Sequence, residues 1–290
     1  MRLVSAFFTF LAAVSVSAIA HADQPYPWQI WHQAPASQMM RDIEWFDFYT
    51  LWFIIPITIF VLALLIIVGV KFKAKSNPKP SRVTHNLAIE AAWTFIPILI
   101  LVFIALPSFK LLDDQLAPAE EPAMTIKATG NQWYWSYEYQ DDSNLSFDSL
   151  LIRTPEDARA EGKGDLTKYP RLLAVDNELV VPINKMVRVL VTASDVIHDF
   201  ALPAFGLKID GIPGRLNETW FKDEREGLYY GQCSELCGRD HAFMPIAIRV
   251  VSDAQFATWK SAAAGGDLSG ANKALVAEIE LKQNVKIAGN

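Results

Sequence analysis

The sequence predicts a membrane-anchored α+β protein, in which an N-terminal two-helix transmembrane hairpin carries an extracytoplasmic β-sandwich or small barrel. Hydrophobic residues make up 51% of the 290-residue chain, but they are concentrated before residue 112. Two long apolar runs in that part are separated by a basic segment. From residue 122 onwards, short alternating runs rich in β-branched and aromatic residues are punctuated by Gly, Pro and Asn, which is typical of strands and turns.

Residues 1–22 have the layout of a cleaved secretory signal peptide. One positive charge, Arg2, precedes a short apolar run that ends in the small-residue pattern Ala-His-Ala. The alternative is a first transmembrane helix. The run is short for that, and a polar segment beginning at Asp23 follows it directly. We therefore expect the mature N-terminus to lie outside the cytoplasm.

Two apolar runs are long enough to cross a bilayer as helices. Phe48–Val70 is free of charge for 23 residues and Ala91–Phe109 for 19. As helices they would be about 35 Å and 28 Å long, close to the ~30 Å of a hydrocarbon core. Buried helices of a soluble protein are the alternative, but two such runs so close together favour a hairpin. We expect helices at about 46–70 and 89–110.

The segment between these runs sets the expected orientation. KFKAKSNPKPSRVTHN contains five Lys and Arg residues and no acid. By the positive-inside rule it is cytoplasmic, so both termini and the C-terminal domain lie outside. The signal peptide predicts the same topology independently. The expected organisation is a signal peptide (1–22), an N-terminal segment and hairpin (23–111), an exported domain (112–263) and a C-terminal tail (264–290).

The exported part is acidic. From residue 112 onwards it has 27 acidic and 18 basic residues, a net charge of −9. Such a surface favours either a cationic partner or simple solubility, and it is not basic enough for nucleic acid. The segment 156–168 is charged and is expected to be an exposed insertion. Residues 253–263 are expected to form a helix, and the small, polar segment 265–290, which has a weak helical patch, is expected to be poorly ordered.

The stretch GQCSELCGRDHAFMP contains both cysteines of the chain, one of its five histidines and one of its six methionines. An exported pair of cysteines usually forms a disulfide, although one that closes so short a loop gains little entropy. Structural zinc would leave the methionine unexplained. Copper accepts thiolate, imidazole and thioether ligands together, as in blue-copper sites.

Counting the histidines supports the copper interpretation. Only His198 and His241 lie in the exported domain. His198 follows an expected strand, Met186–Ser194, and is the only second imidazole that the domain can supply. One thiolate serves one copper ion, whereas two thiolates on one short loop can bridge two. Such a centre would reorganise little on gaining an electron, which suits electron transfer.

Several motifs closely resemble the second subunit of haem-copper cytochrome c oxidases. They cover most of residues 88–252 and, with the transmembrane hairpin, are specific. The signal peptide and tail fit a bacterial, proteobacterial-type member. The resemblance implies a cupredoxin-like β-sandwich with a dinuclear CuA copper centre. The motifs are GNQWYWSYEY (130–139), RLLAVDN (171–177), DVIHDFALPAFGLKIDGIPGR (195–215) and YYGQCSELCGRDHAFMPI (229–246).

The resemblance also implies roles for individual residues. Cys233 and Cys237 would bridge the two copper ions, and His198, His241, Met244 and the carbonyl oxygen of Glu235 would complete the CuA ligands. The Glu235 side chain would bind magnesium at the interface with the large subunit. Trp133 would be where electrons enter, and Glu90 the entrance of a proton path. Glu138, Asp176 and Asp195 would belong to a docking patch for cytochrome c lysines, with Asp141 and Asp142 replacing acids absent at Ser143 and Asn144.

The expected function is the electron-input subunit of a proton-pumping terminal oxidase in the bacterial inner membrane. Such a translocase takes electrons from cytochrome c and passes them through CuA to haem in a large partner subunit, which reduces oxygen to water. The chain lacks a CxxCH motif for a covalent haem of its own. A quinol oxidase subunit would lack the copper ligands, and a nitrous oxide reductase would not be expected to have the hairpin. The alternative from another class is a membrane-anchored copper-delivery protein.

Overall fold

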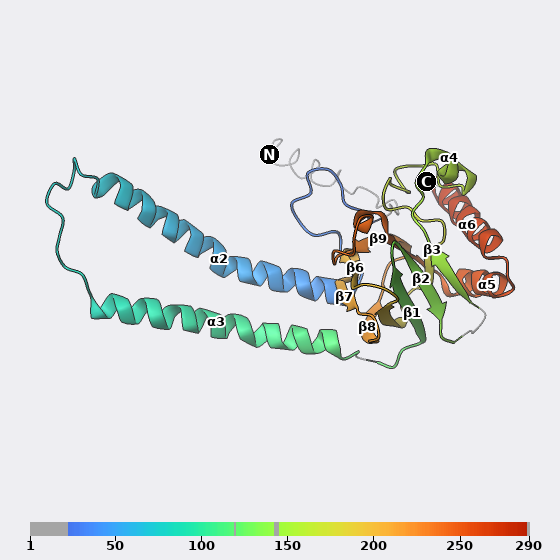
Figure 1. Ribbon diagram of the computed structural model, residues 1–290, viewed down its shortest axis with the longest axis horizontal. Coiled ribbons are helices and arrows are strands. Elements are labelled where there is room, and N and C mark those ends of the chain that lie inside the picture. The colour runs from blue at the N-terminus through green and yellow to red at the C-terminus, as the bar shows by residue number, and fades with distance from the viewer. Residues whose placement is uncertain (1–22, 119, 142–144, 289–290) are drawn as a thin grey trace, which may run out of the picture.

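The computed structural model describes residues 23–118, 120–141 and 145–288. Two long helices project from one side of a β-sandwich, and a pair of shorter helices lies at its opposite end (Figure 1). This arrangement confirms the predicted class, a two-helix hairpin followed by a sandwich. The predicted signal peptide, and Asp142 to Asn144 of the docking region, lie outside the described residues.

The two projecting helices are α2 (Gln38–Lys71) and α3 (Leu87–Leu116). Both are long and apolar enough to cross a membrane. The Tyr49 hydroxyl donates to the Phe103 carbonyl at 3.0 Å and links them. Each helix contains proline and is longer than the apolar run that predicted it.

The first turns of α2 contain charged residues but bury Met39 and Met40, which explains why this helix begins before the expected position. Ser37 caps the helix by accepting from the Met40 backbone N–H at 3.0 Å, and its hydroxyl donates to the Phe205 carbonyl at 2.8 Å. Arg41 donates to Glu224 at 2.7 Å. The transmembrane hairpin is therefore joined to the domain by direct contacts as well as by the chain.

The sandwich consists of two five-stranded sheets. The first has the order β3-β2-β1-β5-β8, with β1 and β5 parallel, and the second has the order β4-β10-β9-β6-β7. Burial alternates along β1, as expected for a strand with one face towards the core. The strands are β1 (Met124–Asn131), β2 (Tyr134–Tyr139), β3 (Ser146–Ser149), β4 (Leu179–Pro182), β5 (Met186–Ala193), β6 (His198–Leu202), β7 (Leu207–Gly211), β8 (Asn217–Lys222), β9 (Gly227–Cys233) and β10 (Pro245–Val251).

The core between the sheets is continuous with the cluster of candidate ligands. Trp135 and Phe200 are fully buried, with ring centroids 5.2 Å apart in an edge-to-face arrangement. Cys233, Cys237 and Met244 belong to the same core cluster. The core therefore forms the inner wall of the candidate site.

The structure differs from the expectation for the tail and adds a detail to the expectation for the 156–168 segment. The tail forms a helix, α6 (Leu268–Ala288), which packs on α5 (Asp253–Ala264) because Leu275 and other apolar side chains face the core. The 156–168 segment begins within the short helix α4 (Pro155–Ala160) and is mostly exposed, as expected, although Lys163 within it is only 3% exposed.

Lys163 is buried because it completes an ion-pair network. Its ammonium group lies 3.1 Å from the carboxylate of Glu178, which also accepts from Arg249, and all three side chains are buried. Lys163 also donates to the carbonyls of Val175 and Asp176, at 2.7 and 2.8 Å. A charged sequence pattern cannot distinguish such a paired buried lysine from an exposed one.

Candidate metal centre

Neighbouring strands bring the candidate ligands together at one end of the second sheet. Cys233 is the last residue of β9, and β10 begins at Pro245. The antiparallel pairing of these strands closes the loop that contains the other candidate ligands. His198 is the first residue of β6, the other neighbour of β9, and Phe200 pairs in register with Cys233. The second imidazole therefore reaches the loop from an adjacent strand.

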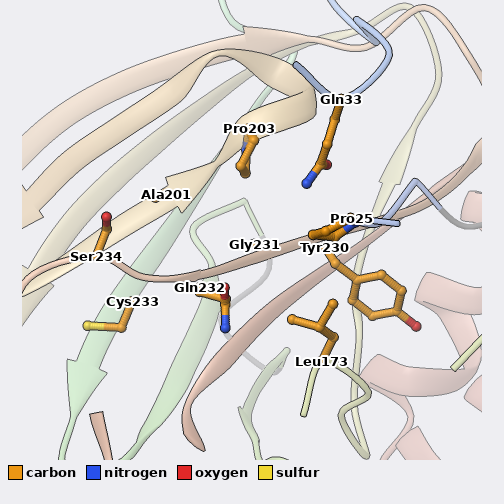
Figure 2. A pocket seen from close by; sticks show the side chains of 10 residues that line it. All are labelled: Pro25, Gln33, Leu173, Ala201, Pro203, Tyr230, Gly231, Gln232, Cys233 and Ser234. Carbon is orange, nitrogen blue, oxygen red and sulfur yellow. The ribbon is translucent and has the colours of Figure 1, made fainter. Parts of the chain in front are cut away.

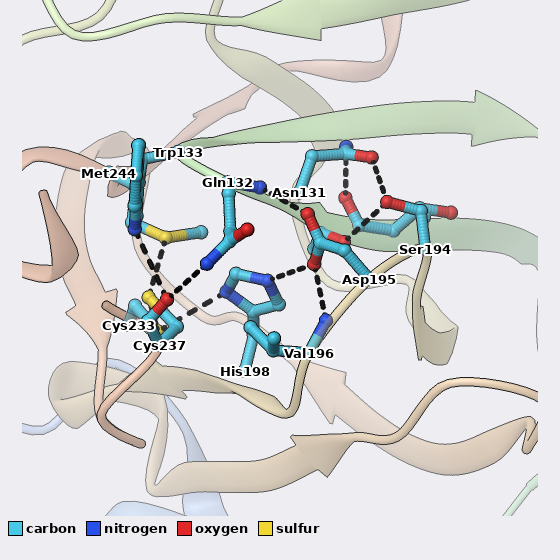
Figure 3. Close-up of polar contacts among 12 residues, drawn as sticks. Asn131, Gln132, Trp133, Ser194, Asp195, Val196, His198, Cys233, Cys237 and Met244 are labelled. Atoms are coloured by element: carbon cyan, nitrogen blue, oxygen red, sulfur yellow. Dashed lines mark hydrogen bonds and ion pairs between the residues drawn. The ribbon is translucent and has the colours of Figure 1, made fainter. Parts of the chain in front are cut away.

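All six candidate donor groups form one connected cluster, of which His198, Cys233, Cys237 and Met244 are labelled in Figure 3. The two sulfur atoms are 3.9 Å apart. Cys233 Sγ lies 3.8 Å from His198 Nδ1 and 3.3 Å from the Glu235 carbonyl oxygen. Cys237 Sγ lies 3.4 Å from Nδ1 of His241 and 3.5 Å from Sδ of Met244. Each sulfur thus has one imidazole and one further donor beside it.

The cysteines are free thiols in this structure. Their sulfur separation of 3.9 Å is far beyond the ~2.05 Å of a disulfide bond. Cys233, Cys237, His198 and Met244 are each at most 6% exposed. The pair is therefore arranged as two separate ligands inside the protein.

The electrostatics of the two thiols favour a cation between them. Burial raises the pKa of Cys233, but hydrogen bonds, the first from His198, outweigh it and lower the pKa overall. Burial and the neighbouring Cys233 raise the pKa of Cys237 to about 12. Two adjacent buried thiolates are unfavourable unless a positive charge lies close to both.

The donor set fits copper. Nδ1 or Nε2 of His198 and the two sulfur atoms lie within 4.8 Å of one another, a separation suited to a shared metal. Zinc would use the thiolates and imidazoles but not a thioether, whereas Met244 Sδ is directed at Cys237. Soft sulfur ligands combined with imidazole are typical of copper electron-transfer sites.

Trp133 lies against the outer side of this cluster. Its indole Nε1 donates to the Cys237 carbonyl at 3.3 Å, and the amide of the preceding Gln132 donates to the same oxygen at 2.8 Å. Gly238 has φ +123, and a Cβ there would lie 3.1 Å from both side chains. The glycine therefore allows the ligand loop and the Trp133 loop to pack closely.

The sequence predicted Asp195 to belong to the docking patch, but in the structure it lies beside His198. Its carboxylate lies 2.8 Å from His198 Nε2 and accepts from the backbone N–H groups of Gln132 and Val196, both at 2.7 Å (Figure 3). Burial acts to raise its pKa, but the hydrogen bonds from His198 and these amides hold the pKa below its usual value. Asp195 therefore orients a candidate ligand and connects it to the Trp133 loop.

The other two acids expected in the docking patch are also engaged within the chain. Glu138 pairs with Lys127 at 2.7 Å. Asp176 accepts from the backbone N–H groups of Leu150 and Asn177, at 2.7 and 2.6 Å, and burial raises its pKa. The Glu138 side chain is 42% exposed despite this pairing.

The side chains of the two remaining candidate residues, Glu235 and Glu90, do not face the donor cluster. The Glu235 side chain is exposed on the ligand loop, while its carbonyl faces Cys233. Glu90 lies in the first turn of α3, at the opposite end of the hairpin from the domain, and accepts from the Asn86 backbone N–H at 3.2 Å (Figure 1).

A small cavity adjoins Cys233 on the other side. It has a volume of about 160 Å³ and lies between β9, β6 and the N-terminal segment (Figure 2). Gln33, Gln232 and Tyr230 contribute to its lining. It is smaller than the ~300–1,000 Å³ of typical organic ligand sites. The geometry here favours a metal site rather than a substrate pocket.

Sequence reasoning missed Gln132 and Trp135 as parts of the site. Trp135 Nε1 donates to the Met244 carbonyl at 3.3 Å, and its ring packs edge-on to His198. The aromatic run 133–137 contained the signal, but only the sandwich reveals which rings face the ligand loop.

Family models match both parts of the chain. One, described as cytochrome c oxidase subunit II, periplasmic domain, matches residues 124–251, and its transmembrane counterpart matches residues 25–111. A probable cytochrome c oxidase subunit 2 of Rickettsia bellii is 45% identical over 96% of this chain and all of its own length. The cytochrome c oxidase subunit 2 of Oenothera berteroana is 46% identical, over 84% of this chain and 93% of its own.

A solved structure is also similar in sequence. The periplasmic domain of subunit II of cytochrome oxidase from Bradyrhizobium japonicum is 61% identical, with a TM-score of 0.44, over 50% of this chain and 95% of that one. The matched sequence relatives extend through both the hairpin and the sandwich. The chain belongs to the cytochrome c oxidase subunit II family, as a two-pass membrane subunit.

Proposed function

We propose that this chain is the electron-input subunit of a proton-pumping terminal oxidase, which accepts electrons from cytochrome c at a dinuclear CuA centre and delivers them to haem in the large subunit. The observation that carries the proposal is the connected set of donor groups, in which neighbouring donor atoms are 3.3–3.9 Å apart. His198, Cys233, Glu235 (through its carbonyl), Cys237, His241 and Met244 would hold the copper ions.

The chemistry follows from the ligands and their burial. Bound copper supplies a site that gains and loses one electron at a time. The protein side chains hold the donor atoms in place through the backbone pairing of β6, β9 and β10, and the core excludes water from the sulfur atoms. A rigid set of ligands with buried sulfur atoms reorganises little when charge changes, which favours rapid transfer.

Trp133 would be the residue through which electrons reach this centre. It is partly exposed, and its indole N–H donates to the backbone of a proposed copper ligand. It therefore connects the protein surface with Cys237 through a single hydrogen bond. This position supports a role as the contact with the haem edge of cytochrome c.

The same proposal assigns roles at two subunit boundaries. The exposed carboxylate of Glu235 would bind magnesium together with the large subunit, while its carbonyl faces the thiol cluster. Glu90, at the cytoplasmic end of α3, would mark the entrance of a proton path. With these roles the sandwich would lie in the periplasm and the hairpin in the inner-membrane lipid, with the basic loop at the cytoplasmic side.

The three proposed docking acids would act on cytochrome c in two different ways. Glu138 is exposed enough to attract a lysine of cytochrome c. The carboxylates of Asp195 and Asp176 accept hydrogen bonds from groups of the same chain. They would therefore contribute charge to the surface rather than direct contacts.

Copper delivery is the competing function, and the burial of the ligands argues against it. A delivery site must exchange its metal with a partner, which requires accessible ligand atoms. His198 is 0% exposed, Met244 1% and Cys237 3%. Such ligands suit a resident metal.

Rapid mixing tests the proposed function. The full chain, purified in detergent and loaded with copper, is mixed with reduced mitochondrial-type cytochrome c while the cytochrome absorbance is followed. The proposal predicts oxidation of the cytochrome with one electron accepted per chain. A copper-loaded chain that stays oxidised in the presence of the reduced cytochrome would rule the proposal out.

A further inference from the structure

One arginine lies against the proposed electron-accepting tryptophan, and a second is linked to it through a shared acid. The Arg239 guanidinium lies over the Trp133 ring, with its Cζ 5.5 Å from the ring centroid. The side chain of Arg239 is 82% exposed. Arg153 lies over the ring of Phe243, at 5.7 Å, and is 56% exposed. Each guanidinium is therefore supported by an aromatic ring while it faces solvent.

A single acid connects the two arginines. Asp240 pairs with Arg239 at 3.3 Å and with Arg153 at 3.7 Å, and it is only 22% exposed. We call Arg153 and Arg239 the arginine pair. Together with Asp240 they contain two positive charges and one negative charge, so the net charge of the three side chains is +1. The N–H groups that point to solvent remain able to donate to an incoming acceptor.

The acids nearest to Trp133 do not cancel this charge by direct pairing with the arginines. Asp195 holds His198 and two backbone amides, and Glu138 pairs with Lys127. The surface of the domain is acidic overall, and Asp195 adds a negative charge beside the Trp133 loop, but the two guanidinium groups are the more exposed charges, at 82% and 56% against 31% for Asp195. A patch of this kind is complementary to a carboxylate, which binds the planar N–H donors of arginine well.

We propose that the arginine pair is a contact site for an aspartate or glutamate side chain of the electron donor. The inference rests on the proposed function, because it assumes that the donor docks at Trp133. The acidic surroundings would attract the basic face of the donor from a distance, and the arginine pair would set its orientation at contact. Arg239 would then determine which donors place their haem edge over Trp133.

A binding experiment with charge-altered partners tests this proposal. The probes are unmodified mitochondrial-type cytochrome c and a series of its variants, each with one haem-edge lysine changed to glutamate. Dissociation constants are measured against the copper-loaded full chain in detergent, at low and at physiological salt. The chain variants are Arg239→Ala, Arg239→Lys and, as a control for the loss of one charge, Arg159→Ala, whose side chain is 64% exposed on α4.

The proposal predicts that Arg239→Ala affects the binding of a glutamate variant of the cytochrome differently from the binding of the unmodified cytochrome. For at least one glutamate variant of the cytochrome, Arg239→Ala weakens binding by about two- to fivefold, a range typical of exposed ion pairs. The same substitution leaves binding of the unmodified cytochrome unchanged or tightens it. Arg239→Lys restores part of the lost affinity, and higher salt reduces the difference. Arg159→Ala changes the affinity for all probes in the same direction.

Two results would overturn the proposal. One is that Arg239→Ala shifts the affinities for all cytochromes in the same direction, as the control does. The other is that it shifts none of them. Electron transfer from the unmodified cytochrome to the unaltered chain is measured in parallel. If that transfer occurs, either result removes only the role of the arginine pair, whereas its absence removes the proposed function itself.

Discussion

The carboxylate of Asp195 lies 2.8 Å from Nε2 of His198, while Nδ1 of the same ring faces the Cys233 sulfur at 3.8 Å. The imidazole is therefore fixed at both nitrogens. A carboxylate that accepts from a metal-binding histidine sets its tautomer and increases its basicity. Asp195 also accepts from the backbone N–H of Gln132. The same carboxylate therefore holds both the candidate ligand and the loop that carries Trp133.

Asp195→Asn is expected to weaken copper binding about 10- to 100-fold, because it removes the negative charge beside His198 with little change in size. Competition titration with a copper chelator measures this. Asp148→Asn is the control, since Asp148 accepts from Ser136 at 2.6 Å outside the donor cluster. An affinity equal to that of the unaltered chain would show that Asp195 does not support the ligand.

Trp133→Phe is expected to slow electron transfer from cytochrome c by about tenfold or more, equivalent to about 1.4 kcal/mol in the barrier. The ring is preserved in part, but the donor to the Cys237 carbonyl is lost. Copper content is expected to remain the same, as judged by metal analysis. Tyr134→Phe, in the next position, is the control. Equal transfer rates for both variants would remove Trp133 from the path.

Asp223 makes the junction between α2 and the sandwich sensitive to pH. It is 0% exposed, no described residue donates to its Oδ2, and burial raises its pKa to about 7. The folded state holds the carboxyl proton of Asp223 more tightly than the unfolded chain does. The stability of the folded protein therefore falls as pH rises from about 4 to about 7. The total loss is at most about 4 kcal/mol.

Asp223→Asn is expected to remove this part of the pH dependence. Thermal midpoints of the full chain in detergent, measured from pH 4 to pH 8, should fall less steeply for this variant than for the unaltered chain. Asp253→Asn is the control, since Asp253 is 66% exposed. Parallel curves for Asp223→Asn and the unaltered chain would contradict the assignment.

Glu178→Gln is expected to destabilise the domain by about 3–5 kcal/mol, because it leaves Lys163 and Arg249 buried without their shared counter-charge. Glu218→Gln removes an exposed partner of Arg188 and should cost less than about 1 kcal/mol. Chemical denaturation of both variants measures the difference. Similar costs would mean that the buried network contributes no more than a surface pair.

The hairpin and the sandwich could be predicted from the sequence because their signals are local. Apolar runs such as Phe48–Val70 and a basic loop define transmembrane helices, and strands such as β1 alternate residue by residue. The cluster in the ligand loop is equally local, and counting histidines was enough to select His198 as the remaining candidate.

The features that escaped prediction depend on contacts between distant segments. Asp195 resembled a surface acid, because its role depends on joining His198 to the backbone of Gln132, which lies 63 residues earlier in the chain. Lys163 resembled part of an exposed insertion, because its partner Glu178 lies on a different loop. Helix α6 has a weak pattern by itself and is stabilised by packing on α5 and the core.

The central claim is that two copper ions share the two thiolates, and the most direct test is the electron paramagnetic resonance spectrum of the oxidised, copper-loaded chain. With Cys233 and Cys237 as common ligands, one unpaired electron is shared between two copper nuclei, and a seven-line hyperfine pattern is expected. Metal analysis should give two copper ions per chain. A four-line pattern from a single copper nucleus, or tight zinc binding with no copper signal, would contradict the account.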